Sequence, residues 1–156
     1  MAGKKTGQSS DRIPTGIPGF DKIIEGGFVK ESVNLITGGT GTGKTIFALQ
    51  WVYNQVQAGR NALYLSFEEN LDGLIGDGLQ FGWDFEKMQA DGRVIMTTFR
   101  PIGSPDIHSE FTEMIKKNNI SVVVIDSISV MALAFQENYY KMRKELYLIA
   151  DMLKRL

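Results

Sequence analysis

Residues 38–45 read Gly38-Gly39-Thr40-Gly41-Thr42-Gly43-Lys44-Thr45 and match the pattern G-x-x-x-x-G-K-[S/T] at every fixed position. Glycine lets such a loop fold so tightly that successive backbone N–H groups point inward, where they can bind phosphate oxygens. The lysine can reach the β- and γ-phosphates of a nucleotide, and the threonine hydroxyl can bind Mg²⁺. We therefore predict a nucleotide site in which Lys44 also assists catalysis and the binding contacts come from Gly39, Thr40, Gly41, Thr42, Gly43, Lys44, Thr45 and Ile46.

The surroundings of this loop favour phosphate binding over the alternative, a glycine-rich turn that happens to precede a lysine. A short, mostly apolar run at residues 33–37 predicts a buried strand before the loop. Apolar residues recur at three- and four-residue steps from 46 to 56, which predicts a helix after it. A strand, the loop and a helix in this order are the setting that the motif requires.

The alternation of strand and helix continues along the chain. Further strands are predicted at residues 62–67, 93–98 and 121–125, and further helices at 22–25, 71–79, 105–114 and 142–156. Ser104 is a candidate N-cap for the third of these helices, with proline at its first position. Repeated alternation predicts an α/β fold with a mostly parallel sheet and helices on both faces.

An aspartate ends one of the predicted strands. Asp126 follows the apolar residues 122–125, where a parallel strand would deliver it to the same edge of the sheet as the phosphate loop. A carboxylate there can hold the hydration shell of Mg²⁺, so we predict that Thr45 and Asp126 form a metal site. The alternative is a loop aspartate that caps the next turn, a role open to Ser127 as well.

Two glutamates follow another predicted strand. Glu68 and Glu69 come directly after residues 62–67 and are therefore expected at the same edge. A carboxylate near the γ-phosphate can orient and deprotonate the attacking water, which is the work of a general base. Two adjacent glutamates are equally typical of a solvated helix start, where the helix dipole favours negative charge. The spacing leaves both interpretations open.

The composition excludes several classes of protein. The chain has 156 residues, which fits one domain, and no cysteine, which excludes disulfides, thiolate metal sites and cysteine nucleophiles. Its 17 lysines and arginines against 18 aspartates and glutamates argue against a dedicated binder of nucleic acid or of a membrane surface. We expect residues 1–11 to form a flexible tail and residues 12–156 one domain. The polar start and the lack of a long apolar run predict a cytoplasmic protein without a membrane span.

Several further motifs give the sequence a family resemblance. They are Thr15-Gly16-Ile17-Pro18-Gly19-Phe20-Asp21, Gly26-Gly27, Phe67-Glu68-Glu69, Phe81-Gly82-Trp83-Asp84 and Ile125-Asp126-Ser127. Together with the phosphate loop, they stand in the order seen in KaiC-like ATPases of the RecA superfamily, and the resemblance runs from residue 13 to the end of the chain. It implies a RecA-like core that binds ATP with Mg²⁺ and hydrolyses it, with Glu68 as the catalytic base and Glu69 assisting. It also implies a ring of subunits, for example a hexamer, with nucleotide at the subunit interfaces.

The resemblance therefore predicts a Mg-dependent ATPase whose nucleotide state drives assembly or the switching of an unknown protein partner. One alternative is a DNA-binding recombinase similar to RecA or RadA, which would need basic or aromatic loops after the strand that ends at Asp126. Residues 129–136 are apolar and uncharged, which argues against DNA. Another alternative is a nucleotide sensor that does not hydrolyse ATP.

The end of the chain predicts an incomplete sheet. Apolar residues still recur at helical spacing from 142 to 156, with no glycine, asparagine or proline to close the helix. RecA-like ATPases carry further strands, and one of them lies between the phosphate-loop strand and the strand that ends at Asp126. We therefore expect the C-terminal part of the domain to be incomplete, or the gap to be filled by another segment or chain. The alternative is a short domain whose sheet closes by direct pairing of residues 121–125 with residues 33–37.

Overall fold

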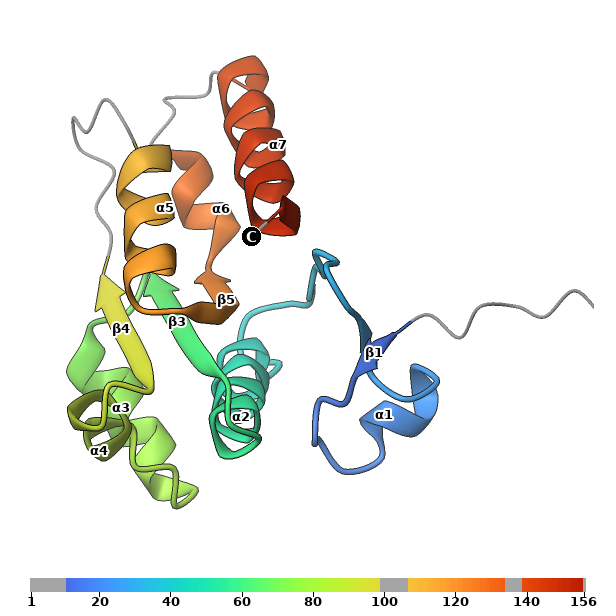
Figure 1. The fold of residues 1–156 in the computed structure, drawn as a ribbon, viewed down its shortest axis with the longest axis vertical. Helices are drawn as coiled ribbons and strands as arrows, with labels where there is room; N and C mark the ends of the chain where they lie inside the picture. Colours follow the sequence, from blue (N-terminus) through green and yellow to red (C-terminus); the bar gives the residue numbers. More distant parts are fainter. Residues whose placement is uncertain (1–10, 99–106, 134–138, 156) are drawn as a thin grey trace, which may run out of the picture.

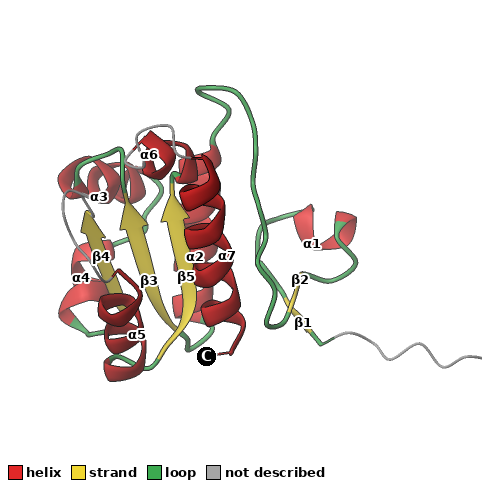
Figure 2. Ribbon diagram, turned by 90° about the horizontal axis from the view of Figure 1, so that it is seen from above, coloured by secondary structure: helices red, strands yellow, loops and turns green. Residues whose placement is uncertain are grey.

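The computed structural model describes residues 11–98, 107–133 and 139–155. Its main sheet has three parallel strands in the order β4 (Val94–Thr98), β3 (Asn61–Ser66) and β5 (Ile120–Asp126). Helices lie on both faces of this sheet (Figures 1 and 2), as the sequence predicted. Since Ser66 pairs with Thr98 on one side and Asp126 on the other, the three strands end together at one edge.

The central strand β3 is buried because a helical layer packs on each of its faces. One layer contains α2 (Lys44–Gln57), α3 (Leu71–Gln80) and α4 (Phe85–Ala90); the other contains α5 (Ile107–Lys117) and α7 (Tyr139–Arg155). Side chains of β3 alternate between the layers, as the period of a strand requires. Tyr64 packs with Leu49 and Val52 of α2, whereas Leu63 and Leu65 pack with residues of α5 and α7.

The N-terminal part of the described chain folds as a small unit against α2. It contains β1 (Arg12–Ile13), α1 (Phe20–Ile23) and β2 (Phe28–Val29), and its two strands pair antiparallel. Edge-to-face ring contacts join Phe20 to Phe47 and Phe28 to Trp51, the second member of each pair lying on α2. Further along α2, the side chains of Asn54 and Gln55 donate hydrogen bonds of 3.1 and 2.8 Å to backbone carbonyls of the unit.

One carboxylate organises the turn that leads into α1. Asp21 accepts hydrogen bonds from the backbone N–H and the hydroxyl of Thr15, at 2.8 and 2.7 Å, and from the N–H of Gly16 at 3.0 Å. Burial alone would raise the pKa of Asp21, but the hydrogen bonds from Thr15 and Gly16 outweigh it and hold this pKa below its usual value. The turn before α1 is thus held by a charged group.

The predicted strand at residues 33–37 is not formed. Val33, Leu35 and Ile36 are 50%, 70% and 41% exposed, and the segment pairs with no strand in the described part of the chain. It runs as a loop between the N-terminal unit and the phosphate loop (Figure 2). A strand requires the backbone of a neighbour, and β5 is paired only with β3 among the described residues. Direct pairing of residues 121–125 with residues 33–37 is therefore wrong, whereas an incomplete C-terminal part stays a prediction.

The other predicted elements are present with small shifts at their ends. The predicted strands after residue 60 correspond to β3, β4 and β5, and the predicted helices after the phosphate loop to α2, α3, α5 and α7. The short helix expected at 22–25 lies at Phe20–Ile23 instead, directly after Gly19 in a left-handed conformation. The short helices α4 and α6 (Ile128–Leu133) were not predicted. The predicted N-cap Ser104 and, apart from Asp11, the predicted tail lie outside the described residues.

Candidate nucleotide site

The phosphate loop curls tightly before α2. Gly41 and Gly43 have φ angles of 74° and 85°, a backbone region that glycine adopts at no steric cost. Gly43 is the N-cap of α2, and its carbonyl accepts a hydrogen bond of 2.8 Å from the N–H of Phe47. Thr40 lies in the exposed turn, and Ile46 lies in the first turn of the helix. The loop therefore places the N-terminus of α2, which carries a partial positive charge, at the edge of the sheet where the strands end.

The lysine of the motif lies across this loop. Its ammonium group donates hydrogen bonds to the carbonyl oxygens of Gly38 and Gly39, at 3.0 and 2.8 Å. The hydroxyl of Thr42 donates to the same carbonyl of Gly39 at 2.8 Å. Lys44 and Thr42 together hold the first glycines of the loop close to the start of α2.

Asp126 joins the phosphate loop to the end of β5. Its Oδ2 accepts a hydrogen bond of 2.8 Å from Thr45 Oγ1, although the two residues are 81 positions apart in the sequence. The same oxygen accepts a second hydrogen bond of 2.7 Å from the hydroxyl of Tyr64 on β3. The two residues predicted to bind metal thus lie side by side, together with the hydroxyl of Tyr64.

The two glutamates precede α3 rather than beginning it. Asn70 is the N-cap of α3, because its side chain accepts a hydrogen bond of 2.7 Å from the N–H of Gly73. Ser66 fixes the backbone of Glu69, since its hydroxyl accepts from the N–H at 3.0 Å and donates to the carbonyl at 2.7 Å. The Oε2 of Glu68 lies 3.4 Å from the hydroxyl of Ser127. The turn between β3 and α3 therefore holds both glutamates next to the end of β5.

Negative charge accumulates at this edge of the sheet. Burial, followed by the negative charges of Asp77, Asp126 and Glu68, raises the pKa of Glu69 above its usual value. Burial and the charge of Asp126 also raise the pKa of Tyr64, so that its phenol stays protonated and acts as a donor. A divalent cation bound here would relieve the repulsion among these carboxylates.

The oxygen ligands at this edge suit Mg²⁺ better than they suit a metal ion that is bound by protein groups alone. Thr45 and Asp126 offer one hydroxyl and one carboxylate, both hard oxygen donors. Among the described residues, no three histidines, cysteines, aspartates or glutamates come together as a metal site. Mg²⁺ commonly keeps several waters and takes further ligands from phosphates, so two protein groups suffice for it.

Two contacts at the site were not foreseen from the sequence. The sequence pattern predicts Tyr64 only as part of the strand at residues 62–67, although its hydroxyl contacts Asp126. Ser127 was expected to cap a turn, and its hydroxyl does accept a bond of 3.4 Å from the N–H of Val130 at the start of α6, besides donating to Glu68. A tyrosine two residues before the end of a strand is the one signal that could have suggested the first contact.

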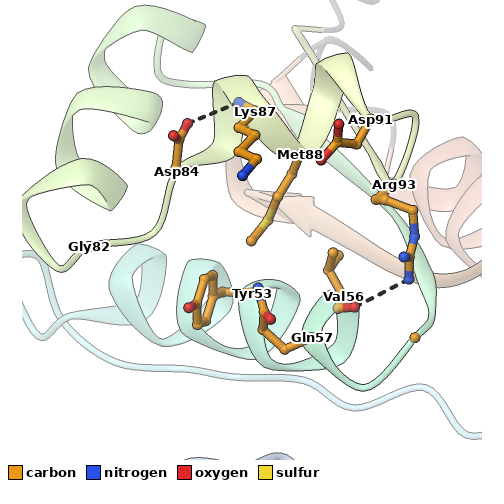
Figure 3. Close-up of a pocket in the computed structure, with 10 residues that line it drawn as sticks. Tyr53, Val56, Gln57, Gly82, Asp84, Lys87, Met88, Asp91 and Arg93 are labelled. Carbon is orange, nitrogen blue, oxygen red and sulfur yellow. Dashed lines mark hydrogen bonds between the residues drawn. The ribbon is translucent and has the colours of Figure 1, made fainter.

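A cavity of about 480 Å³ lies elsewhere, towards the far end of α2 (Figure 3). Its lining includes Tyr53, Val56, Gln57, Lys87, Met88 and Arg93. Asp84 caps α4 there by accepting a bond of 2.9 Å from the N–H of Lys87, and Arg93 donates to the carbonyl of Val56 at 3.3 Å. None of the predicted site residues lines this cavity, so it is separate from the nucleotide site.

The sequence is similar to proteins of a known family. The family model described as "ATPase: KaiC" matches residues 13–156. The chain belongs to the KaiC ATPase family. A UPF0273 protein of Pyrococcus furiosus is 33% identical over 137 residues, which cover 77% of this KaiC-family chain and 56% of that protein. The circadian clock oscillator protein KaiC of Parasynechococcus marenigrum is 32% identical over 135 residues, which cover 85% of the chain and 26% of that protein.

A solved structure resembles the fold. The crystal structure of a KaiC-like protein from Pyrococcus horikoshii OT3 matches with a TM-score of 0.83 and 36% identity, covering 94% of the present chain and 66% of its own. This match confirms the predicted RecA-like α/β core. The KaiC-family chain spans about half the length of the UPF0273 relative and about a quarter of the circadian protein. Membership of this ATPase family supports nucleotide binding in general.

In the described ranges, no helix combines the length and the apolar character that crossing a membrane demands.

Proposed function

We propose that this chain binds ATP with Mg²⁺ at its phosphate loop and hydrolyses it. The observation that carries the proposal is the hydrogen bond of 2.8 Å from Thr45 to Asp126. A glycine-rich turn without function has no need of a carboxylate from a distant strand, whereas a magnesium nucleotide needs both groups at one place. The ammonium of Lys44, which contacts the carbonyls of Gly38 and Gly39, adds a cation within the same loop.

The proposed roles follow from the chemistry of each group. Backbone N–H groups of residues 39–46 and the N-terminus of α2 would bind the phosphates. The ammonium of Lys44 would exchange its bonds to Gly38 and Gly39 for bonds to the β- and γ-phosphates, which are stronger because both partners are charged. Thr45 and Asp126 would hold Mg²⁺, which when bound neutralises negative charge on the phosphates.

Glu68 is the proposed general base. It would accept the proton of the water that attacks the γ-phosphate, and its contact with Ser127 keeps its carboxylate near Asp126. Glu69 is the proposed assisting residue. The raised pKa of Glu69 makes its carboxylate a stronger base. Hydrogen bonds to Ser66 hold the backbone of Glu69 in place. The negative charge of Glu69 also favours the binding of a cation nearby.

The proposal extends to assembly. Residues 38–43 of the phosphate loop are exposed, which leaves one side of a bound nucleotide open to a neighbouring subunit. We therefore propose a cytoplasmic ring, for example a hexamer, with nucleotide at the subunit interfaces and an unknown protein partner whose binding depends on hydrolysis. DNA binding is not part of the proposal, since the formal net charge is −1 and residues 129–136 are uncharged.

The test is phosphate release by a Glu68→Gln variant. The variant should bind Mg-ATP as the parent does while releasing phosphate about 10²-fold more slowly, the scale of a positioned general base. Glu86→Gln, in the first turn of α4, is the matched control and should release phosphate at the parent rate. Unchanged turnover in Glu68→Gln would assign the base to another residue. Tight ATP binding by the parent without phosphate release would favour the second candidate, a nucleotide sensor.

A further inference from the structure

The hydroxyl of a buried tyrosine contacts the carboxylate of the proposed metal site. The Tyr64 side chain is fully buried, and its ring packs with Leu49 and Val52 of α2. Its hydroxyl donates a hydrogen bond of 2.7 Å to Asp126 Oδ2. A buried tyrosine hydroxyl needs a polar partner, but a backbone carbonyl would serve that need equally well. The partner is instead the one carboxylate that the phosphate loop also contacts.

The strand register explains how the two groups meet. Tyr64 pairs with Val124, and Ser66 pairs with Asp126, so Tyr64 lies two residues before the position opposite the carboxylate. Two residues of a strand advance by roughly 6.6 Å, and a tyrosine is long enough to span that step along the sheet. A phenylalanine at position 64 would fill the same place in the core without contacting Asp126.

The two donors occupy one oxygen of the carboxylate. Thr45 Oγ1 and the Tyr64 hydroxyl both donate to Oδ2, at 2.8 and 2.7 Å, which uses the two lone pairs of that atom. Among the described residues, none donates a hydrogen bond to Oδ1 of Asp126. Because the threonine hydroxyl donates its proton to Oδ2, its own lone pairs stay available to a cation.

We propose that Tyr64 is a positioning residue for Mg²⁺, whose hydroxyl fixes the Asp126 carboxylate so that Oδ1 is the oxygen left for the cation or its bound water. The inference rests on the proposed function, since it presupposes that Mg²⁺ binds with the nucleotide. Tyr64 acts through Asp126 and contacts neither metal nor nucleotide. Without its hydroxyl, the carboxylate keeps only the bond from Thr45 and can rotate away from the orientation that the cation needs.

The test measures Mg²⁺ affinity separately from nucleotide affinity. MgCl₂ is titrated into the protein saturated with a fluorescent ATP analogue, and the analogue is titrated separately in EDTA. In Tyr64→Phe, the half-saturating Mg²⁺ concentration should rise about tenfold, the scale of one hydrogen bond to a charged group, while the affinity in EDTA changes by less than about twofold. Tyr53→Phe on α2, which lines the separate cavity, is the matched control and should leave both values unchanged.

A double-mutant cycle shows whether the effect passes through the carboxylate. In an Asp126→Asn background, Tyr64→Phe should change Mg²⁺ affinity little further, because coupled residues are not additive. An unchanged Mg²⁺ affinity in Tyr64→Phe would overturn the role of Tyr64 alone, and so would an equal loss of affinity with and without Mg²⁺. If the nucleotide affinity of the parent protein does not depend on Mg²⁺, the proposed function is wrong, and so is the positioning role of Tyr64.

Discussion

The carboxylate of Asp21 offers a quantitative test of how the N-terminal unit is held. Its Oδ1 accepts two bonds from Thr15, and its Oδ2 accepts one from Gly16 at 3.0 Å. Asparagine at this position keeps only one acceptor oxygen, so an N–H donor must face another N–H donor on one side. We expect Asp21→Asn to cost about 1–2 kcal/mol at pH 7, around the lower end of the range for hydrogen bonds to charged groups, because Asp21 is partly exposed.

The stabilisation by the Asp21 carboxylate should depend on pH in a defined direction. The pKa of Asp21 is lower in the folded than in the unfolded protein, so the unfolded state binds more protons and stability rises with pH. This contribution is complete above the unfolded pKa of about 4 and is lost as the pH falls through the folded value. The difference in free energy of unfolding between parent and Asp21→Asn should therefore shrink from pH 7 to pH 3.

Urea unfolding followed by tryptophan fluorescence measures that difference, because Trp51 packs against the N-terminal unit through Phe28. Asp11→Asn, an exposed position at the start of the same unit, is the control and should match the parent at both pH values. An equal cost of Asp21→Asn at pH 7 and pH 3 would show that the charge of Asp21 does not stabilise the turn.

Three further outcomes are expected. Thr45→Ala should weaken ATP binding in the presence of Mg²⁺ more than in EDTA, which calorimetric titration measures, since the threonine hydroxyl is a proposed metal ligand. Glu69→Gln should unfold at a higher temperature than the parent at pH 7 but not at acidic pH, because the raised pKa means that its charge costs stability only once the carboxyl ionises. Phosphate release per subunit should fall on dilution through the range where oligomers dissociate, if a neighbouring subunit supplies a transition-state cation; a constant specific activity would contradict the ring.

Local sequence signals predicted the parts of the fold that local chemistry determines. The glycines at 41 and 43 need left-handed backbone angles and mark the phosphate loop, and apolar spacing predicted the helix that follows it. The placement of Asp126 beside Thr45 could also be predicted, because parallel strands that end together bring their last residues to one edge. Each of these inferences depends on short-range pattern and on a general rule of topology.

The remaining features depend on contacts that the sequence pattern does not contain. Residues 33–37 have the composition of a strand, but a strand also needs a neighbouring backbone, and in the described chain they have none. The short helix α4 is held by the cap of Asp84 and the buried Phe85 rather than by a long apolar face. The bond from Tyr64 to Asp126 arises from register and side-chain length together, which no single motif reveals.

The central claim is that the phosphate loop and Asp126 form one site for a magnesium nucleotide. Calorimetric titration of ATP into the parent protein and into Lys44→Ala, each with Mg²⁺ and with EDTA, tests it most directly. We expect tighter binding with Mg²⁺ in the parent and a loss of about 10²-fold or more in Lys44→Ala, since the variant lacks the one cation of residues 38–45 that could bind the phosphates. Equal ATP affinity in the parent and Lys44→Ala, with no influence of Mg²⁺ on either, would contradict it.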